Sequence, residues 1–258
     1  MLVCPKCRKP LILKDRSFCC ENRHSYDLAK SGYVNLVLGN TKTSGDSKEM
    51  VKARSEFLNH GYYQPLSLRL NELLLEYHVA ALVDAGCGEG YYTQRFPVSS
   101  KFGFDLSKQA LIEASKRDKR TRYAIASIFD LPVADDSVDA MVNIFAPIPF
   151  QEALRILRGK GILLVVSPAQ KHLWGLKSVL YEHPYENELN EVDSLSMKKI
   201  HEEILSYPIH VEREHIIPLF MMTPYYWKSG KDALKKLEEL NSLDTEAAFR
   251  IQIFQKQE

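Results

Sequence analysis

The chain has 258 residues, enough for one large domain or for one domain with a small additional module. Its 45% hydrophobic and 26% charged residues are typical of a globular protein and exclude a disordered or fibrous chain. No apolar run approaches the roughly 18 residues that span a bilayer, and no signal-peptide core precedes the first cysteines. We therefore expect a soluble, cytoplasmic protein.

The net charge of +1 conceals an uneven distribution along the chain. Residues 1–45 contain eight Lys or Arg and three acidic residues, a net +5, and the remaining residues carry −4. A basic segment attached to a mildly acidic body indicates contact with a polyanion. The alternative is that these charges form a solvated polar face.

Four of the five cysteines fall within the first 20 residues, which in a chain without a secretory signal favours metal binding over disulfides. Two ligand pairs stand at the spacing of a zinc ribbon: Cys4 with Cys7, and Cys20 with His24. The apolar stretches 11–13 and 17–19 between the pairs predict a short hairpin. Cys19 would point to the opposite face of its strand and is not expected to be a ligand. The spacing predicts a closed, structural zinc site; free thiols beside a chance histidine are the alternative.

The segment after this module is expected to connect it to the rest of the chain. The turn-rich polar run at 39–45 predicts a mobile connection. Asp46 or Ser47 is then placed to cap a helix. The apolar face of this helix is expected to consist of Met50, Ala53, Phe57 and Leu58. The helix is expected to end at 60–61, and the next element to start at 62–65.

From residue 79 the pattern changes to strand, glycine-rich loop and helix. The strand at 79–84 ends in Asp84, and the strand at 101–105 ends in Asp105, an acid placed to hold ribose hydroxyls. The loop between them has glycines at positions 86, 88 and 90. It is expected to open a helix whose N–H groups favour an anion. The G-x-G-x-G spacing differs from the G-x-G-x-x-G of dinucleotide loops and fits an adenosine ligand with a short zwitterionic tail, which describes S-adenosylmethionine (SAM).

The following segments continue the alternation of helices and strands. We expect helices at 107–117 and 150–157, and strands at 122–126, 137–145 and 161–167. Beyond a polar stretch we expect a helix near 194–205, a strand at 208–217 and a terminal strand at about 246–254. Five strands that alternate with helices, followed by two late strands, predict a doubly wound α/β sheet with its ligand at the carboxyl ends of the strands.

Two sets of motifs together resemble a known family. The loop Val-Asp-Ala-Gly-Cys-Gly-Glu-Gly-Tyr-Tyr-Thr at 83–93, with Asp105, is similar to the SAM site of class I SAM-dependent methyltransferases. In the front segment, the zinc ligands are followed by Tyr-Asp-Leu-Ala-Lys-Ser-Gly-Tyr-Val-Asn-Leu at 26–36 and Gly-Asp-Ser-Lys-Glu-Met at 45–50. This combination is similar to the bacterial 23S rRNA (guanine-N1)-methyltransferase family called RlmA.

The resemblance implies a Rossmann-like, doubly wound, seven-stranded α/β sheet with an N-terminal zinc-ribbon module. We expect a zinc-binding module at 1–38, a linker and helix at 39–70, and a SAM-binding methyltransferase domain at 71–258. The resemblance also implies SAM and a structural Zn²⁺ on Cys4, Cys7, Cys20 and His24. It further implies a homodimer and, as substrate, a hairpin of 23S rRNA that the zinc module helps to recognise.

Contacts with SAM are expected at the glycine loop, at the acids that end the first two strands, and after the fifth strand. The residues placed there are Tyr63, Asp84, Gly86, Gly88, Glu89, Asp105, Ser127, His172 and Lys177. Ser127 stands where many relatives outside the family place an Asp for the adenine amine.

Methyl transfer to guanine N1 needs an in-line nucleophile that has lost its proton, so a general base or a carbonyl that polarises the N1–H bond is required. The segment after the fourth strand lies at the expected end of the sheet. Asn143 is a candidate for contact with the flipped base and Phe145 for stacking on it, with core strand and turn as the alternative. The sequence identifies no acid or histidine as the base.

Two other functions are compatible with these motifs. One is a small-molecule SAM-dependent methyltransferase with a structural zinc ribbon, and the other is a module that keeps SAM as a structural ligand. Basic side chains on one face and a wide cleft would favour RNA, whereas a lidded apolar pocket would favour a small acceptor. A closed cleft would favour the non-catalytic module.

Overall fold

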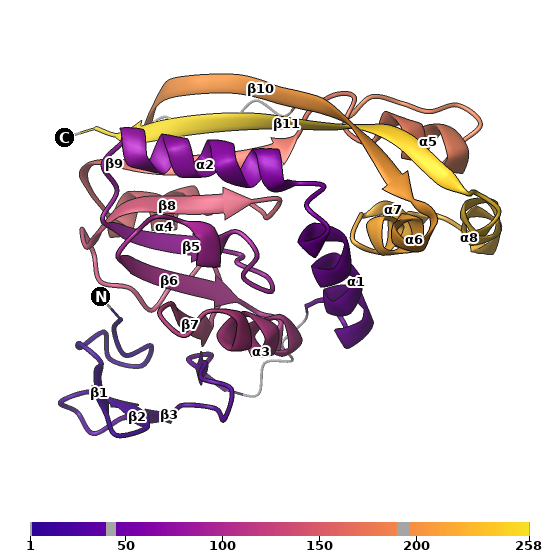
Figure 1. Ribbon diagram of the computed structural model, residues 1–258. Helices are drawn as coiled ribbons and strands as arrows, with labels where there is room; N and C mark the ends of the chain where they lie inside the picture. Colours follow the sequence, from indigo (N-terminus) through magenta and orange to yellow (C-terminus); the bar gives the residue numbers. More distant parts are fainter. Residues whose placement is uncertain (1, 40–44, 190–196, 258) are drawn as a thin grey trace.

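The computed structural model describes residues 2–39, 45–189 and 197–257 (Figure 1). The predicted N-terminal module contains a small antiparallel sheet in the order β1-β2-β3. Its strands are β1 (Ile12–Lys14), β2 (Ser17–Cys19) and β3 (Ser25–Asp27). Ile12 pairs with Cys19 and Lys14 with Ser17, so the predicted hairpin is confirmed.

A second sheet has eight strands in the order β10-β11-β9-β8-β5-β6-β7-β4, and its edge strand β4 comes from the end of the predicted module. Its strands are β4 (Val34–Asn35), β5 (Ala81–Ala85), β6 (Ser100–Asp105), β7 (Arg122–Ile125), β8 (Val138–Ile144), β9 (Leu157–Pro168), β10 (Met197–Glu212) and β11 (Ser242–Lys256). The strands from β4 to β9 are parallel, and β11 is antiparallel to both β9 and β10. Seven of these strands form the predicted doubly wound α/β sheet of class I methyltransferases. The eighth, β4, extends its edge beside β7.

The helices are α1 (Lys48–Asn59), α2 (Gln64–Glu76), α3 (Lys108–Arg117), α4 (Phe150–Ile156), α5 (Trp174–Leu180), α6 (Arg213–Met221), α7 (Tyr225–Lys228) and α8 (Lys231–Glu238). Ser47 is the N-cap of α1 and accepts a hydrogen bond from the Met50 N–H, as the sequence predicts. None of the helices within the described ranges has both the length and the apolar character needed to cross a membrane.

The two faces of the sheet bury separate apolar clusters. Alternating residues of β8 divide between them: Val142 packs with α1 and α2 on one face, and Met141 packs with α4 on the other. The second cluster also includes Leu2, Leu11 and Phe18 of the N-terminal module. The module therefore shares a hydrophobic core with the large domain.

Three expectations for secondary structure are wrong. The expected helix near 194–205 lies partly outside the described residues, and from Met197 the chain is strand β10. Met197, Ile200 and Ile204 fit a helical spacing, but pairing with β11 along the whole strand outweighs this local pattern. The expected strand at 208–217 stops at Glu212, where α6 begins.

The third correction concerns the glycine loop, which opens only a 3-10 turn, η1 (Thr93–Arg95), and not an α-helix. Phe96 follows this turn in an extended conformation and precedes Pro97. A proline disfavours the helical conformation in the residue before it, so the helix cannot continue. The loop therefore offers fewer free N–H groups than a long helix would.

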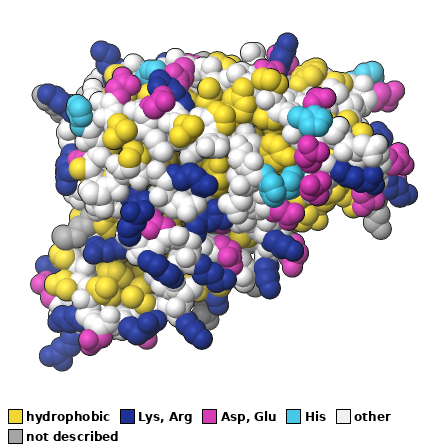
Figure 2. Space-filling model, viewed as in Figure 1, with side chains coloured by type: hydrophobic (Ala, Val, Ile, Leu, Met, Phe, Trp, Pro, Cys, Tyr) yellow, Lys and Arg dark blue, Asp and Glu magenta, His cyan; other side chains and the backbone are white. Residues whose placement is uncertain are grey.

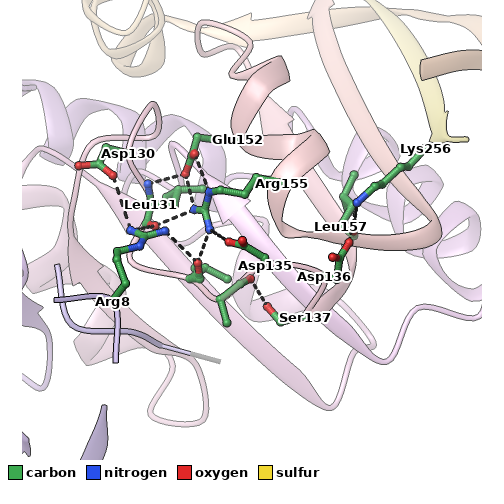
Figure 3. Close-up of polar contacts among 12 residues, drawn as sticks. Arg8, Asp130, Leu131, Asp135, Asp136, Ser137, Glu152, Arg155, Leu157 and Lys256 are labelled. Atoms are coloured by element: carbon green, nitrogen blue, oxygen red, sulfur yellow. Dashed lines mark hydrogen bonds and ion pairs between the residues drawn. The ribbon is translucent and has the colours of Figure 1, made fainter. Parts of the chain in front are cut away.

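A pair of arginines fixes the N-terminal module to the large domain (Figure 3). The Arg8 guanidinium donates to the Leu131 carbonyl at 3.1 Å and to the Val133 carbonyl at 3.4 Å. Arg155 of α4 donates to the same two carbonyls, at 2.9 and 2.6 Å. The Val3 N–H adds a hydrogen bond to the Pro132 carbonyl at 2.9 Å. Both domains thus hold the loop at residues 130–133.

An Arg8→Ala substitution is expected to loosen this junction and to lower the free energy of unfolding by about 1 kcal/mol, the usual net value of such hydrogen bonds. Hydrogen–deuterium exchange should speed up at residues 130–133. The matched control is Lys14→Ala, which removes an exposed cation at the end of β1. Equal exchange at 130–133 in both variants would show that Arg8 does not hold the loop.

Candidate metal centre and ligand cavity

The four predicted metal ligands converge in the N-terminal module. The ligand atoms of Cys4, Cys7, Cys20 and His24 all lie within 4.8 Å of one another. The Cys7 and Cys20 sulfurs are 3.7 Å apart, and His24 Nδ1 lies 3.4 Å from the Cys4 and Cys20 sulfurs. Ligands bound to one zinc at about 2.3 Å in a tetrahedron would lie about 3.7 Å from each other. Three thiols and one imidazole at this spacing fit zinc.

Neighbouring groups favour the thiolate of Cys4, the form that a metal requires. Burial alone would raise the pKa of the Cys4 thiol, but hydrogen bonds from Tyr26 and from the Lys6 and Cys7 backbone lower it to about 6. The Tyr26 hydroxyl lies 3.2 Å from the Cys4 sulfur. Cys19 lies outside the cluster, and its thiol donates to the Ser25 hydroxyl at 3.5 Å. The structure therefore separates Cys19 from the other three cysteines, as the sequence predicts.

A cavity of about 1120 Å³ opens where β5, β6, β8 and β9 end. Its volume slightly exceeds the 300–1,000 Å³ or so that is common for a single small ligand. One group of lining residues comes from the glycine loop and its surroundings: Asp46, Arg54, Tyr63, Asp84, Gly86, Gly88, Glu89 and Asp105. A second group comes from the loops after β8 and β9, from the segment after α5 and from the α6–α7 region: Phe145, His172, Tyr185, Glu186, Asn187, Glu188, Met222, Tyr225 and Lys228.

The glycine loop has a backbone that side chains would obstruct. Gly86 has φ +88°, and a Cβ there would lie 2.8 Å from the Ala146 Cβ. Gly90 has φ +77°, and its Cβ would meet the Tyr123 hydroxyl at 2.9 Å. These contacts and the positive φ angles explain why glycine is needed at both positions.

Asp105 fixes the shape of this loop. One of its carboxylate oxygens accepts from the Gly88 N–H at 2.9 Å, and the other accepts from the Ser107 N–H at 2.7 Å. Because each carboxylate oxygen can accept two hydrogen bonds, both oxygens retain a lone pair for a ligand hydroxyl. Burial raises the pKa of Asp105.

Two further buried acids stand beside it. Burial raises the pKa of Asp84 to about 7, against the opposing effect of a hydrogen bond from Thr93 at 2.5 Å. Burial also raises the pKa of Glu89, and the positive charge of Arg54 partly opposes this increase. A cationic ligand would relieve this concentration of negative charge.

Tyr63 and His172 form a buried pair on the cavity wall. The Ala248 N–H donates to His172 Nδ1 at 3.2 Å, so Nε2 carries the ring proton and faces the Tyr63 hydroxyl at 3.3 Å. Burial lowers the pKa of His172 to about 3. The imidazole is therefore neutral at physiological pH and can position Tyr63 without adding charge.

Three residues expected in the site lie outside the cavity lining that the described residues form. Ser127 accepts from the Phe129 N–H at 3.2 Å and stabilises its own turn. The Lys177 ammonium lies behind the segment 185–187. Asn143 is fully buried, and its amide donates to the carbonyls of Ala85 and Pro147 at 3.2 and 3.1 Å. Asn143 thereby fixes the loops on both sides of the cavity floor.

Phe145 lies in the cavity with 43% of its surface exposed. Its φ of +57° is rare for a bulky residue, and its N–H donates to the Val166 carbonyl at 3.0 Å. Its ring stacks near His172, with 6.3 Å between the ring centroids. Strained backbone is common where a side chain must be directed into a site.

Asp46 and Arg54 also line the cavity, although the sequence analysis did not single them out as ligand-binding residues. They form an ion pair with each other. The Asp46 carbonyl accepts from the Ser107 hydroxyl at 3.0 Å, which brings the segment before α1 against the start of α3. Nothing in the local spacing signals this long-range contact.

Basic side chains gather on one face of the molecule. Figure 2 shows Lys and Arg over the N-terminal module and the α3 region, which lie side by side in Figure 1. Exposed Lys and Arg in the module include Lys6, Arg8, Lys9, Lys14, Arg16 and Arg23, and those in and after α3 include Lys108, Lys116, Lys119, Arg120 and Arg122. This face is suited to a polyanion.

Comparisons with known proteins match both parts of the chain. The family model described as "RlmA, N-terminal" matches residues 2–45, and a methyltransferase-domain model matches residues 83–165. The 23S rRNA (guanine-748-N1)-methyltransferase of Streptomyces fradiae is 34% identical over 93% of this chain and 90% of its own length. A candidate 23S rRNA (guanine-N1)-methyltransferase of Bacillus subtilis is 30% identical over 95% of this chain and 93% of its own. Among solved structures, the YcgJ protein of Bacillus subtilis aligns with a TM-score of 0.48 at 16% identity, over 74% of this chain and 98% of that protein.

Proposed function

Because the chain belongs to the family of 23S rRNA (guanine-N1)-methyltransferases, we propose that it transfers a methyl group from SAM to N1 of a guanine in a hairpin of 23S rRNA. The observation that carries this proposal is the 34% identity with the Streptomyces enzyme over 90% of that enzyme's length. The cofactors are SAM and a structural zinc ion. A small-molecule methyltransferase is not favoured, because the relatives that match the whole chain act on rRNA.

The zinc ion would be held by Cys4, Cys7, Cys20 and His24, whose four donor atoms lie within 4.8 Å of one another. With four protein ligands this site has no open position and serves structure. It would stabilise a module whose three strands have only three residues each.

SAM would lie along the glycine loop, with its ribose hydroxyls at Asp105. When bound, SAM supplies a methyl group activated by its positive sulfonium. The protein contributes the backbone of Gly86 and Gly88, which lines the cavity without a side chain. It also contributes two buried acids on the cavity wall, Asp84 and Glu89. Tyr63 and His172 close the same wall as a neutral pair.

SAM affinity is expected to fall as the pH is lowered from 8 to 6. Asp84 has a pKa of about 7 because it is buried, so its carboxylate is charged above this pH and neutral below it. SAM carries a net positive charge, so protonation of Asp84 removes an electrostatic attraction. The loss is expected to lower SAM affinity by up to about tenfold. Titration calorimetry at each pH measures the effect. Asp84→Asn should bind more weakly and lose the pH dependence; an unchanged dependence would assign it to another group.

The acceptor would enter the remaining part of the cavity, beside Phe145, whose ring is exposed there. Asn143 would act by holding the floor of this region through Ala85 and Pro147. The N1 proton of guanine must leave before or during transfer, and polar groups of the cavity are available to accept it. The basic N-terminal module would bind the phosphates of the RNA.

Two finer features belong to the same proposal. We infer that the enzyme is a homodimer and that it acts in the cytoplasm, where rRNA is assembled into ribosomes. Multi-angle light scattering of the purified protein tests the dimer: a mass near 59 kDa supports it, and a mass near 29.6 kDa contradicts it.

The function is tested by methyl transfer from labelled SAM to unmodified 23S rRNA, with 16S rRNA as the matched control. Label in 23S rRNA and none in 16S rRNA is the expected result. Equal labelling of both would contradict the proposed substrate. Label in neither, with SAM binding intact, would contradict RNA methylation and direct attention to small acceptors.

A further inference from the structure

One wall of the cavity is the segment at residues 185–188, which contains neither helix nor strand. Such a segment has no backbone ladder to fix it, so its position depends on contacts with its neighbours. Two of these contacts come from a single buried cation. The Lys177 ammonium donates to the Tyr185 carbonyl and to Asn187 Oδ1, both at 2.7 Å.

Lys177 is itself firmly placed. It belongs to α5, and it is completely buried. The Gly175 N–H on the same helix donates to the Thr245 hydroxyl at 3.0 Å, which ties α5 to β11. The Lys177 ammonium also lies 4.6 Å from the centre of the Tyr185 ring and 5.6 Å from that of Tyr225. Burial lowers the pKa of Lys177, because removing the ammonium from water costs free energy. An apolar side chain at this position would not have this cost.

Asn187 completes the attachment. Its side chain donates to the Ala169 carbonyl at 2.8 Å, and its N–H donates to the Gln170 carbonyl at 2.8 Å. These carbonyls follow β9 and precede His172 on the cavity wall. The segment is therefore held between α5 and the loop after β9.

The side chains that line the cavity here are two exposed aromatic rings together with the acidic side chains of Glu186 and Glu188. Tyr185 is 51% exposed and Phe145 is 43% exposed, although both line the cavity. Tyr225 also lines the cavity and is 7% exposed. Exposed rings in a cavity with room for a second ligand are suited to a flat, unstacked base, because every base offers a π-face.

We propose that the Tyr185 ring is the stacking platform for the target guanine and that Lys177 is the positioning residue that holds this platform in the cavity. The proposal rests on the proposed function, since it concerns the RNA base that the enzyme would methylate. It gives Lys177 a role toward the acceptor, whereas the family resemblance implies a contact with SAM. The two roles differ in what they predict for Lys177→Met: a contact with SAM predicts weaker SAM binding, and the positioning role predicts unchanged SAM binding.

Single-turnover methyl transfer to unmodified 23S rRNA, together with calorimetric SAM binding, tests the platform. Tyr185→Ala should lower the transfer rate or the apparent RNA affinity by roughly 5- to 150-fold, the effect of losing one stacked base. SAM affinity should stay within about twofold. Tyr185→Phe keeps the ring and should recover most of the loss. Trp227→Ala, which removes a 71% exposed ring of α7, is the matched control.

The positioning role is tested with Lys177→Met and Asn187→Ala, alone and combined. Lys177→Met should impair transfer to RNA with SAM affinity unchanged. If both residues act through one wall, the double variant should be little worse than the more impaired single variant. Asn187→Ala also keeps the test valid if Lys177→Met fails to fold, because it removes the side-chain attachment of the wall and leaves Lys177 in place.

The outcomes separate this inference from the function on which it rests. No methylation of 23S rRNA by the unsubstituted enzyme would overturn the proposed function. Methylation by that enzyme, with Tyr185→Ala and Asn187→Ala within about twofold of it, would overturn the platform alone. A loss of SAM affinity in Lys177→Met would return Lys177 to the cofactor site and overturn its positioning role.

Discussion

Asp105→Ala is expected to weaken SAM binding by about 100-fold or more and to abolish measurable methyl transfer. The substitution removes the proposed partner of the ribose hydroxyls, and hydrogen bonds to a charged group are worth about 1.5–3 kcal/mol each. It also frees the Gly88 N–H, so the loop loses the contact that shapes it. Titration calorimetry with SAM measures the binding, and thermal unfolding shows whether the domain remains folded.

Asp232→Ala provides the matched control, since it removes an exposed acid on α8. It should bind SAM as the unsubstituted enzyme does. Asp105→Asn is informative as well, because its amide cannot accept from both the Gly88 and Ser107 N–H groups. A folded Asp105→Ala protein with unchanged SAM affinity would show that this carboxylate is not part of the cofactor site.

Cys7→Ser is expected to release the zinc ion and to unfold the N-terminal module. Metal binding supplies roughly 10–16 kcal/mol in small zinc modules, far more than three-residue strands can replace. Zinc content, measured by elemental mass spectrometry, should fall well below one ion per chain. Hydrogen exchange should lose protection across residues 2–38, and transfer to RNA should fall at least about tenfold.

Cys19→Ser tests whether this effect is specific to the ligand set. The Cys19 thiol is adjacent to Cys20 in sequence but contacts Ser25, so the substitution should leave one zinc per chain and normal protection. SAM affinity should change little in either variant, because the cofactor cavity is built from the large domain. A Cys19→Ser protein without zinc, or a Cys7→Ser protein with it, would contradict the assigned ligands.

Local chemistry was sufficient to predict much of the structure. The cysteine and histidine spacing predicted the four-atom cluster, which the folded chain brings together. Ser47 was a candidate cap because a short hydroxyl preceded an apolar helical pattern, and it caps α1. The strand-loop-strand pattern placed Asp84, Gly86, Gly88 and Asp105 on one cavity, because parallel strands bring their carboxyl ends to the same edge. The proposed division at residues 38 and 70 stays a prediction.

Features that depend on distant partners could not be predicted in this way. The polar segment of β10 has a helical spacing of apolar residues and becomes a strand because β11 pairs with it. Asp46 and Arg54 reach the cavity only because the start of α1 packs against the start of α3. The wall at 185–188 is held in position by Lys177. The sequence identified Lys177 as a candidate site residue but could not predict which segment it would contact.

The docking of the N-terminal module also depends on tertiary contacts. Arg8 and Arg155 approach the same two carbonyls from different domains. This geometry makes the module part of the enzyme's rigid body and places its basic face beside α3. We therefore expect one continuous basic surface to bind the RNA, and not two surfaces joined by a flexible tether.

The most direct test of the account is the identity of the product nucleoside. Unmodified 23S rRNA should be treated with the enzyme and labelled SAM, digested to nucleosides and analysed by mass spectrometry. The account predicts label in 1-methylguanosine, and its absence when the Asp105→Ala protein is used. Label in any other nucleoside, or no label while SAM still binds, would contradict methylation of guanine N1.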